Sequence, residues 1–233
     1  MNQPSKSFWA GVRAAAPLLI GVFPFGLIYG ALALASGLSP AAAQMMSSIV
    51  FAGSAQFVTA QLVRDSAPGL VIVLTITIVN LRHMLYSASV APYVEHLPAR
   101  WKTLLAYLLT DEAYATSIIH YEEDGLQPTS HWFFLGAGLS LWTTWQICTA
   151  LGIFLGAAIP SSWPLDFAAP LTFIALVVPV CKDKPVVAAA LSAGMVALLA
   201  YSLPFKLGLI LAALVGIFIG TYLEGRNFLK GAQ

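Results

Sequence analysis

The stretch VRAAAPLLIGVFPFGLIYGALALA, residues Val12–Ala35, contains a single charged side chain, that of Arg13. It is longer than the roughly 20 predominantly apolar residues that an α-helix needs to cross the hydrocarbon core of a bilayer. The stretch therefore predicts a transmembrane helix. It is also too long for the apolar region of a cleavable signal peptide, so we expect none.

The composition of the whole chain agrees with this first stretch. Hydrophobic residues make up 59% of the sequence, charged residues 9%, and the mean hydropathy is +0.82. A soluble domain carries about 25% charged residues. The formal net charge is only +1 and no basic patch is present, so nucleic acid is excluded as an expected partner. The predicted fold class is an all-α membrane protein in contact with the lipid bilayer.

Eight apolar runs are candidates for spanning helices, which predicts a polytopic bundle in a single domain covering residues 1–233. The sixth and seventh are short and flank a charged loop, so seven spans is an open alternative. The candidates are Val12–Ala35, Pro40–Leu62, Gly69–Val90, Trp101–Ile119, Trp132–Ile159, Leu165–Val180, Pro185–Tyr201 and Phe205–Leu223.

Basic residues in the loops predict the orientation, because they are enriched on the cytoplasmic side. With eight spans and a cytoplasmic N-terminus, seven basic residues lie inside and three outside. We therefore expect both termini in the cytoplasm and a bacterial inner-membrane location. The seven are Lys6, Arg13, Arg64, Lys182, Lys184, Arg226 and Lys230, and the three are Arg100, Lys102 and Lys206.

Two further expectations concern repeats and cysteines. Leu38-Ser39-Pro40 precedes the second run much as Trp163-Pro164 precedes the sixth, which leaves two weak, parallel repeats open. Cys148 and Cys181 lack metal-ligand spacing and are expected to be small apolar residues, so no metal or cofactor is predicted.

The first run contains Pro24 and Gly26, which predict a kink or break in the helix, since proline removes a helical hydrogen bond. The alternative is a packing helix, because both residue types are common in membrane spans. Gly26 and Gly30 form a pair of small residues four positions apart, which favours close helix packing.

The second run contains Phe51-Ala-Gly-Ser-Ala-Gln-Phe57, with small residues and an amide in the middle of the span. A half-helix starting here would direct free backbone N–H groups at an anionic group. Gly53, Ser54 and Gln56 are therefore candidate substrate ligands. The alternative is that Gln56 bonds a neighbouring helix.

The third run ends in Asn80-Leu-Arg-His-Met-Leu-Tyr86, which places Arg82 inside the apolar segment. A charge at such depth costs about 2.5–3.5 kcal/mol, so Arg82 needs a partner, water or the membrane interface. His83 is a candidate proton relay because imidazole titrates near neutral pH, although a structural role remains open.

The fourth run places Asp111 and Glu112 about ten residues from either end. Acids at this depth indicate function, and we expect one to face a transport route and the other to hold Arg82 or a helix end. At spacings of four and three residues, Asp111 is expected to share a helix face with Tyr107 and Tyr114. The alternative is that the segment is partly interfacial and its acids are solvated.

Taken together, Phe51–Phe57, Leu81–Tyr86, Leu109–Ala115 and the Phe-Pro-Phe-Gly of the first run resemble the AzlC family of branched-chain amino acid exporters. The resemblance is specific in the first half of the chain. It implies export of leucine, isoleucine, valine and methionine, together with a small AzlD-type membrane subunit. No phosphate-binding loop is present, so the proton motive force is the expected energy source.

An aliphatic amino acid needs donors for its carboxylate, an acid for its ammonium and an apolar pocket. Gly53–Gln56 with Arg82 would supply the donors, Asp111 or Glu112 the acid, and phenylalanines the pocket. Protonation of Asp111 or Glu112 would weaken its hold on the ammonium, which would couple proton movement to release. Three alternatives stay open: another transporter or channel, an assembly subunit that transports nothing, and an intramembrane hydrolase using Ser54 and His83. No nucleophile-elbow pattern surrounds Ser54, so we expect no enzyme.

Overall fold

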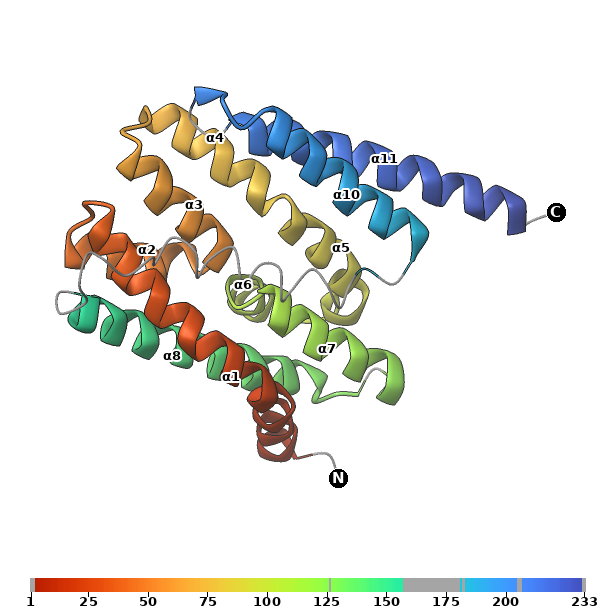
Figure 1. Ribbon diagram of the computed structural model, residues 1–233. Helices are drawn as coiled ribbons and strands as arrows, with labels where there is room; N and C mark the ends of the chain where they lie inside the picture. Colours follow the sequence, from red (N-terminus) through yellow and green to blue (C-terminus); the bar gives the residue numbers. More distant parts are fainter. Residues whose placement is uncertain (1–2, 126, 157–180, 182, 205–206, 232–233) are drawn as a thin grey trace.

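A computed structural model describes residues 3–125, 127–156, 181, 183–204 and 207–231. The long elements in these residues are all α-helices (Figure 1). The predicted all-α fold is confirmed. Large apolar side chains lie on the outside, for example Ile20 at 78% exposure and Phe154 at 80%. Such a surface suits lipid rather than water.

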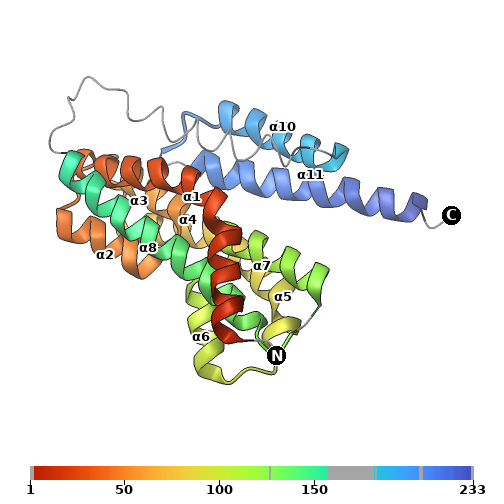
Figure 2. The same ribbon diagram turned by 90° about the horizontal axis from the view of Figure 1, so that it is seen from below.

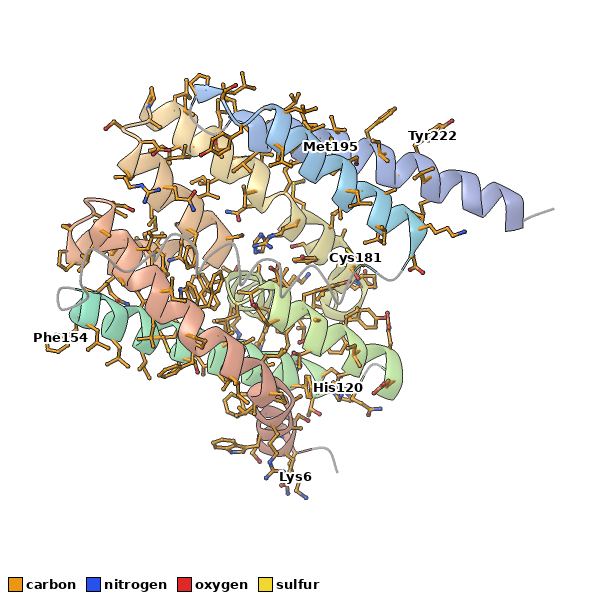
Figure 3. All side chains as sticks on the ribbon, viewed as in Figure 1. Lys6, His120, Phe154, Cys181, Met195 and Tyr222 are labelled. Carbon is orange, nitrogen blue, oxygen red and sulfur yellow. The ribbon has the colours of Figure 1, made fainter. Side chains whose placement is uncertain are left out.

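Helices α1 (Pro4–Ala35) and α8 (Ser130–Gly156) pack closely against each other and run in the same direction. Glycines bring the two backbones together along their whole length. A Cβ on Gly30 would lie 2.4 Å from the Thr149 carbonyl oxygen, and one on Gly152 would lie 2.1 Å from that of Leu27. Lys6 marks one end of this pair and Phe154 the other, and we call these the Lys6 end and the Phe154 end (Figure 3).

Of the kink or break predicted at Pro24 and Gly26, the break is absent, because helix α1 stays helical through both residues. The helix is bent along its length, and its two parts run in different directions (Figure 2). Gly26 serves packing, because a Cβ there would lie 2.7 Å from the Cβ of Cys148. The close packing predicted for Gly26 and Gly30 is confirmed.

The second predicted span is interrupted halfway, as its small residues suggest. Helix α2 (Pro40–Val50) ends at Phe51, whose φ of 40° is left-handed, and α3 (Gly53–Arg64) begins two residues later. The prediction that this segment crosses the bundle once is wrong. Helix α2 runs against α1, and α3 turns back to run with it: Gly53 lies beside Phe25, and the ring of Phe57 lies 5.8 Å from that of Tyr29. The two halves form a hairpin that enters from the Phe154 end and returns to it (Figure 1).

The third predicted span is a crossing with a local interruption. Helices α4 (Gly69–Asn80) and α5 (Arg82–Val94) lie in line, and Leu81 between them keeps helical angles. Gly69–Val94 is apolar and long enough to cross a membrane as a unit. It therefore leads from the Phe154 end to the Lys6 end.

The fourth predicted span is a second hairpin. In helix α6 (Ala99–Tyr107), Trp101 lies 5.0 Å from Trp132 and Tyr107 accepts a hydrogen bond from Trp142, so α6 runs along α8. Helix α7 (Asp111–Asp124) then returns, because its Tyr121 donates to the carbonyl of Ser130. The prediction that this segment crosses once is contradicted, because α6 starts at the Lys6 end and α7 finishes there.

Helices α10 (Lys184–Leu199) and α11 (Leu207–Gly231) pack against each other in a hairpin. A Cβ on Gly216 would lie 3.0 Å from that of Ala193, so the contact again depends on small residues. The sixth predicted span and Trp163-Pro164 lie outside the described residues. Within the described residues, four helical segments are long and apolar enough to cross a membrane, so a count of seven or eight spans is not confirmed.

Candidate functional site

A cavity of about 660 Å³ lies where the two hairpin tips and the α4–α5 junction meet. Its polar lining comes from the first residues of α3, α5 and α7. Its apolar walls come from α1, α8 and α10. The polar residues are Ser54, Arg82, His83, Tyr86, Thr110, Asp111 and Glu112, and the walls include Val22, Phe25, Phe51, Leu141, Trp145 and Ala189.

Arg82 joins the three helix starts. Its Nη1 donates to Oδ2 of Asp111 at 2.6 Å, and its Nη2 donates to Oγ of Ser54 at 2.5 Å. The side chains of Arg82 and Asp111 are 31% and 36% exposed, so the pair borders the cavity. Arg82 thus has an acidic partner, as predicted.

The starts of α3 and α7 have opposite chemistry. Thr110 accepts a hydrogen bond from the Ala113 N–H at the start of α7, and Asp111 and Glu112 occupy its first turn. The start of α3 follows Ala52, which offers no side-chain cap, and its first turn contains no acid. Because the first N–H groups of a helix have no partner within it, α3 presents its positive end at the cavity without an anion of its own.

His83 and Glu112 complete the polar end of the cavity. The Nδ1 of His83 lies 3.2 Å from the carbonyl oxygen of Asn80, which α4 leaves free at its C-terminus. Glu112 lines the cavity, and no ion pair within 4.0 Å involves it among the described residues.

Gln56, predicted as a substrate ligand, does not line the cavity. Its side chain is fully buried beside Tyr29 on another face of α3. Gln56 lies three residues after Gly53, within the same first turn, but its direction excludes it from the polar end. Gly53 and Ser54, the other two candidate ligands of this segment, line the cavity.

Tyr107 does not share a face with Asp111, because the chain is not helical between them. Its hydroxyl donates instead to the carbonyl of Ser48 at the end of α2. Tyr114 lies on the same helix as Asp111 and donates to Ser89.

Trp145 and the residues of α10 are cavity residues that the sequence did not indicate. Trp145 is 5% exposed, its ring lies 5.9 Å from that of Tyr29, and its Cη2 would lie 3.2 Å from a Cβ on Gly53. A tryptophan inside an apolar run cannot be distinguished from a packing residue by sequence. Cys181 also lines the cavity, whereas Cys148 is fully buried, as predicted.

The geometry gives Ser54 and His83 separate partners, Arg82 and the Asn80 carbonyl. The pairing that a serine hydrolase needs between nucleophile and base is therefore not the arrangement seen here. No group of three metal-binding side chains occurs within the described part of the chain.

Fold and site together define a polytopic helical membrane protein with an ion pair in an internal, mainly apolar cavity. The sequence matches the family described as AzlC protein over residues 17–159, which runs from Pro17 within α1 to the end of α8 and includes Ser54, Arg82, His83, Thr110, Asp111 and Glu112 of the cavity. The chain belongs to the AzlC family, which is associated with membrane transport.

Three relatives show how far the similarity extends. The Escherichia coli (strain K12) "Inner membrane protein YgaZ" is 27% identical over 93% of this chain and 89% of its own. An Archaeoglobus fulgidus protein named "Uncharacterized membrane protein" is 32% identical over 93% and 96%. The Bacillus subtilis "Branched-chain amino acid transport protein AzlC" is 26% identical over 76% and 70%. No solved structure matches.

Proposed function

We propose that this protein is a secondary transporter that exports leucine, isoleucine, valine and methionine across the bacterial cytoplasmic membrane. A small AzlD-type subunit and the proton motive force belong to the proposal. One observation carries it: the uncapped start of α3, next to Arg82, opens into a cavity with apolar walls. The name of the Bacillus subtilis relative supports the same substrate class.

The substrate carboxylate binds at the start of α3. Backbone N–H groups at a helix N-terminus form an anion site, and none of the first-turn side chains of α3 competes for it. Arg82 adds a positive charge at the same place, since its Nη2 lies 2.5 Å from Ser54 Oγ. A carboxylate here is therefore held without entering an apolar environment unpaired.

The substrate ammonium binds at the acidic start of α7. Asp111 and Glu112 both line the cavity that the α3 start opens into. An α-amino acid carries its ammonium and its carboxylate on the same carbon atom, Cα. The two charged groups are therefore close enough together to bind at the neighbouring starts of α7 and α3. A zwitterion also adds no net charge to the cavity.

The apolar walls receive the aliphatic side chain. Phe25, Phe51, Leu141 and Trp145 line the cavity, and Phe25 and Trp145 lie against Gly53 at the start of α3. Burial of a Leu or Ile side chain against such walls contributes about 1.5–3 kcal/mol. This accounts for selection of branched aliphatic over polar amino acids.

The test uses cells that lack their own branched-chain exporters and are loaded with a leucine-containing dipeptide. Cells producing this chain and a matching small subunit are expected to lose internal leucine faster, and an uncoupler is expected to abolish the difference. Cells with the small subunit and the Arg82→Gln variant are the control. An unchanged rate of loss, with both subunits inserted, would contradict the proposal.

A further inference from the structure

We infer that the two neighbouring acids have separate tasks, which deepens the proposed function and rests on it. Asp111 is a positioning residue that holds Arg82 at the start of α3. Glu112 is the carboxylate that binds the substrate ammonium and exchanges it for a proton.

The carboxylate of Asp111 is engaged by protein groups. Its Oδ2 accepts the 2.6 Å hydrogen bond from Arg82, its Oδ1 is buried, and the Tyr86 side chain interacts with the same carboxylate. The same contact fixes the guanidinium, whose other terminal nitrogen reaches Ser54. Asp111 thus determines where the positive charge of Arg82 lies.

Glu112 has the opposite surroundings. It follows Asp111 by one residue, so the two side chains leave α7 about 100° apart. It lines the cavity, its hydrogen-bond partners are the uncharged Thr110 side chain and its own backbone N–H, and among the described residues it has no cationic partner within 4.0 Å. A carboxylate without a cation beside the cavity is the group able to bind an ammonium.

The exchange balances in atoms and charge. The ionised Glu112 binds the substrate ammonium on the cytoplasmic side. On the other side a proton forms an O–H bond with the Glu112 carboxylate, the ammonium leaves, and no bond of the substrate breaks. Release of that proton to the cytoplasm completes a cycle in which one amino acid leaves for each proton that enters.

Several titratable or charged groups share the cavity with Glu112 and belong to the same electrostatic site. Helix α7 supplies Asp111, α5 supplies three residues, and one cysteine precedes α10, whereas α3 and α8 supply only uncharged cavity residues. The groups are Asp111, Arg82, His83, Tyr86 and Cys181.

The first experiment measures leucine exchange in proteoliposomes containing both subunits, with equal pH on both sides and a series of pH values. In Glu112→Gln, exchange is expected to persist at a raised half-saturation concentration and to be independent of pH. In Asp111→Asn, the half-saturation concentration is expected to rise about tenfold or more, the effect of losing a hydrogen bond to a charged group, with the pH dependence retained. Asp111→Glu is expected to restore part of the affinity. A pH-dependent Glu112→Gln, or a pH-independent Asp111→Asn, would overturn the division of tasks.

A second measurement does not depend on the substrate. Thermal unfolding of the detergent-solubilised chain is compared for Glu112→Gln, Asp111→Asn, Arg82→Gln and the double variant Arg82→Gln/Asp111→Asn. Asp111→Asn is expected to lower the melting temperature, and the loss in the double variant is expected to be smaller than the sum of the single losses. Glu112→Gln is expected to melt like the unmodified chain. Equal losses for Glu112→Gln and Asp111→Asn would refute the positioning role, whereas failure of the unmodified chain to move leucine would refute only the proposed function.

Discussion

Two short sequences at corresponding points of the two hairpins have different chemistry. Ala52-Gly53-Ser54 begins α3 with no side-chain cap and no acid, whereas Thr110-Asp111-Glu112 begins α7 with both. A helix N-terminus is stabilised by a nearby anion, and α7 supplies its own. The start of α3 leaves that position open beside Arg82, which is why a substrate carboxylate is placed there.

Arg82 bridges two acceptors, and this geometry gives the first prediction. In Arg82→Lys the charge is retained, but an ammonium cannot present two fixed donors to Asp111 and Ser54 at once. We expect normal membrane insertion and at least about tenfold weaker leucine transport. Arg13→Lys, in the first part of α1 and away from the cavity, is the matched control. Leucine efflux equal to that of the control would contradict the bridging role.

The two cysteines differ in access, which gives the second prediction. Cys181 is partly exposed and lines the cavity, whereas Cys148 is fully buried in α8. N-ethylmaleimide is expected to label the chain at Cys181 only, and leucine is expected to slow this labelling several-fold. Mass spectrometry of the labelled chain makes the measurement, with Cys181→Ser as the control. Labelling of Cys148 at an equal rate would show that the packing around it is looser than described.

At the scale of elements, the two hairpins form because their helices are too short to cross a membrane. Helices α2, α3, α6 and α7 have 9 to 14 residues, or about 14–21 Å, which is less than the roughly 30 Å of a hydrocarbon core. Helix ends inside a membrane need partners for their free carbonyls. At the end of α2 the Ser47 carbonyl accepts from Nε2 of Gln146 at 3.1 Å and the Ser48 carbonyl accepts from Tyr107.

The α1–α8 contact gives the third prediction, with a control in the same helix. In Gly30→Ala the new Cβ would lie 2.4 Å from the Thr149 carbonyl oxygen, so the helices must separate. Overpacking of this kind costs about 1–3 kcal/mol, and we expect a lower melting temperature. A Cβ on Gly21 would meet no neighbouring atom within 4 Å, so Gly21→Ala is expected to leave the melting temperature unchanged or slightly higher, because alanine favours the helix. A similar loss in both variants would argue against the close contact.

At the scale of the molecule, the hairpins enter from opposite ends and change the distribution of charge. Arg100 and Lys102 begin α6 at the Lys6 end, because the neighbouring Trp101 contacts Trp132 at the start of α8. Arg64 ends α3 at the Phe154 end. The allocation of these three residues by a simple eight-span count is therefore wrong. We propose that the Lys6 end, with Lys6, Arg13, Arg100 and Lys102, faces the cytoplasm.

This arrangement gives the fourth prediction. Single cysteines replace Ala35, Ala67, Glu95 and Pro128 in a chain whose own two cysteines are serines, and intact cells are treated with a membrane-impermeant maleimide. Positions 35 and 67 are expected to react from outside, and positions 95 and 128 only after the membrane is opened. Eight simple crossings predict that positions 35 and 67 lie on opposite sides, and that outcome would rule out the α2–α3 hairpin.

The sequence by itself determined the membrane environment, the all-α class and the existence of a break near Gly53, because these depend on composition, run length and local backbone chemistry. It also indicated Arg82 with an acidic partner, since a charge in an apolar run needs compensation. Only the tertiary structure decided that the second and fourth runs are hairpins. Hydropathy is the same for a helix that continues and for one that turns back, and the turn depends on contacts with Gln146, Trp142 and Ser130 far along the chain. The direction of each side chain at the breaks was likewise settled by packing, which is why Gln56 lies away from the cavity and Trp145 lies in its wall.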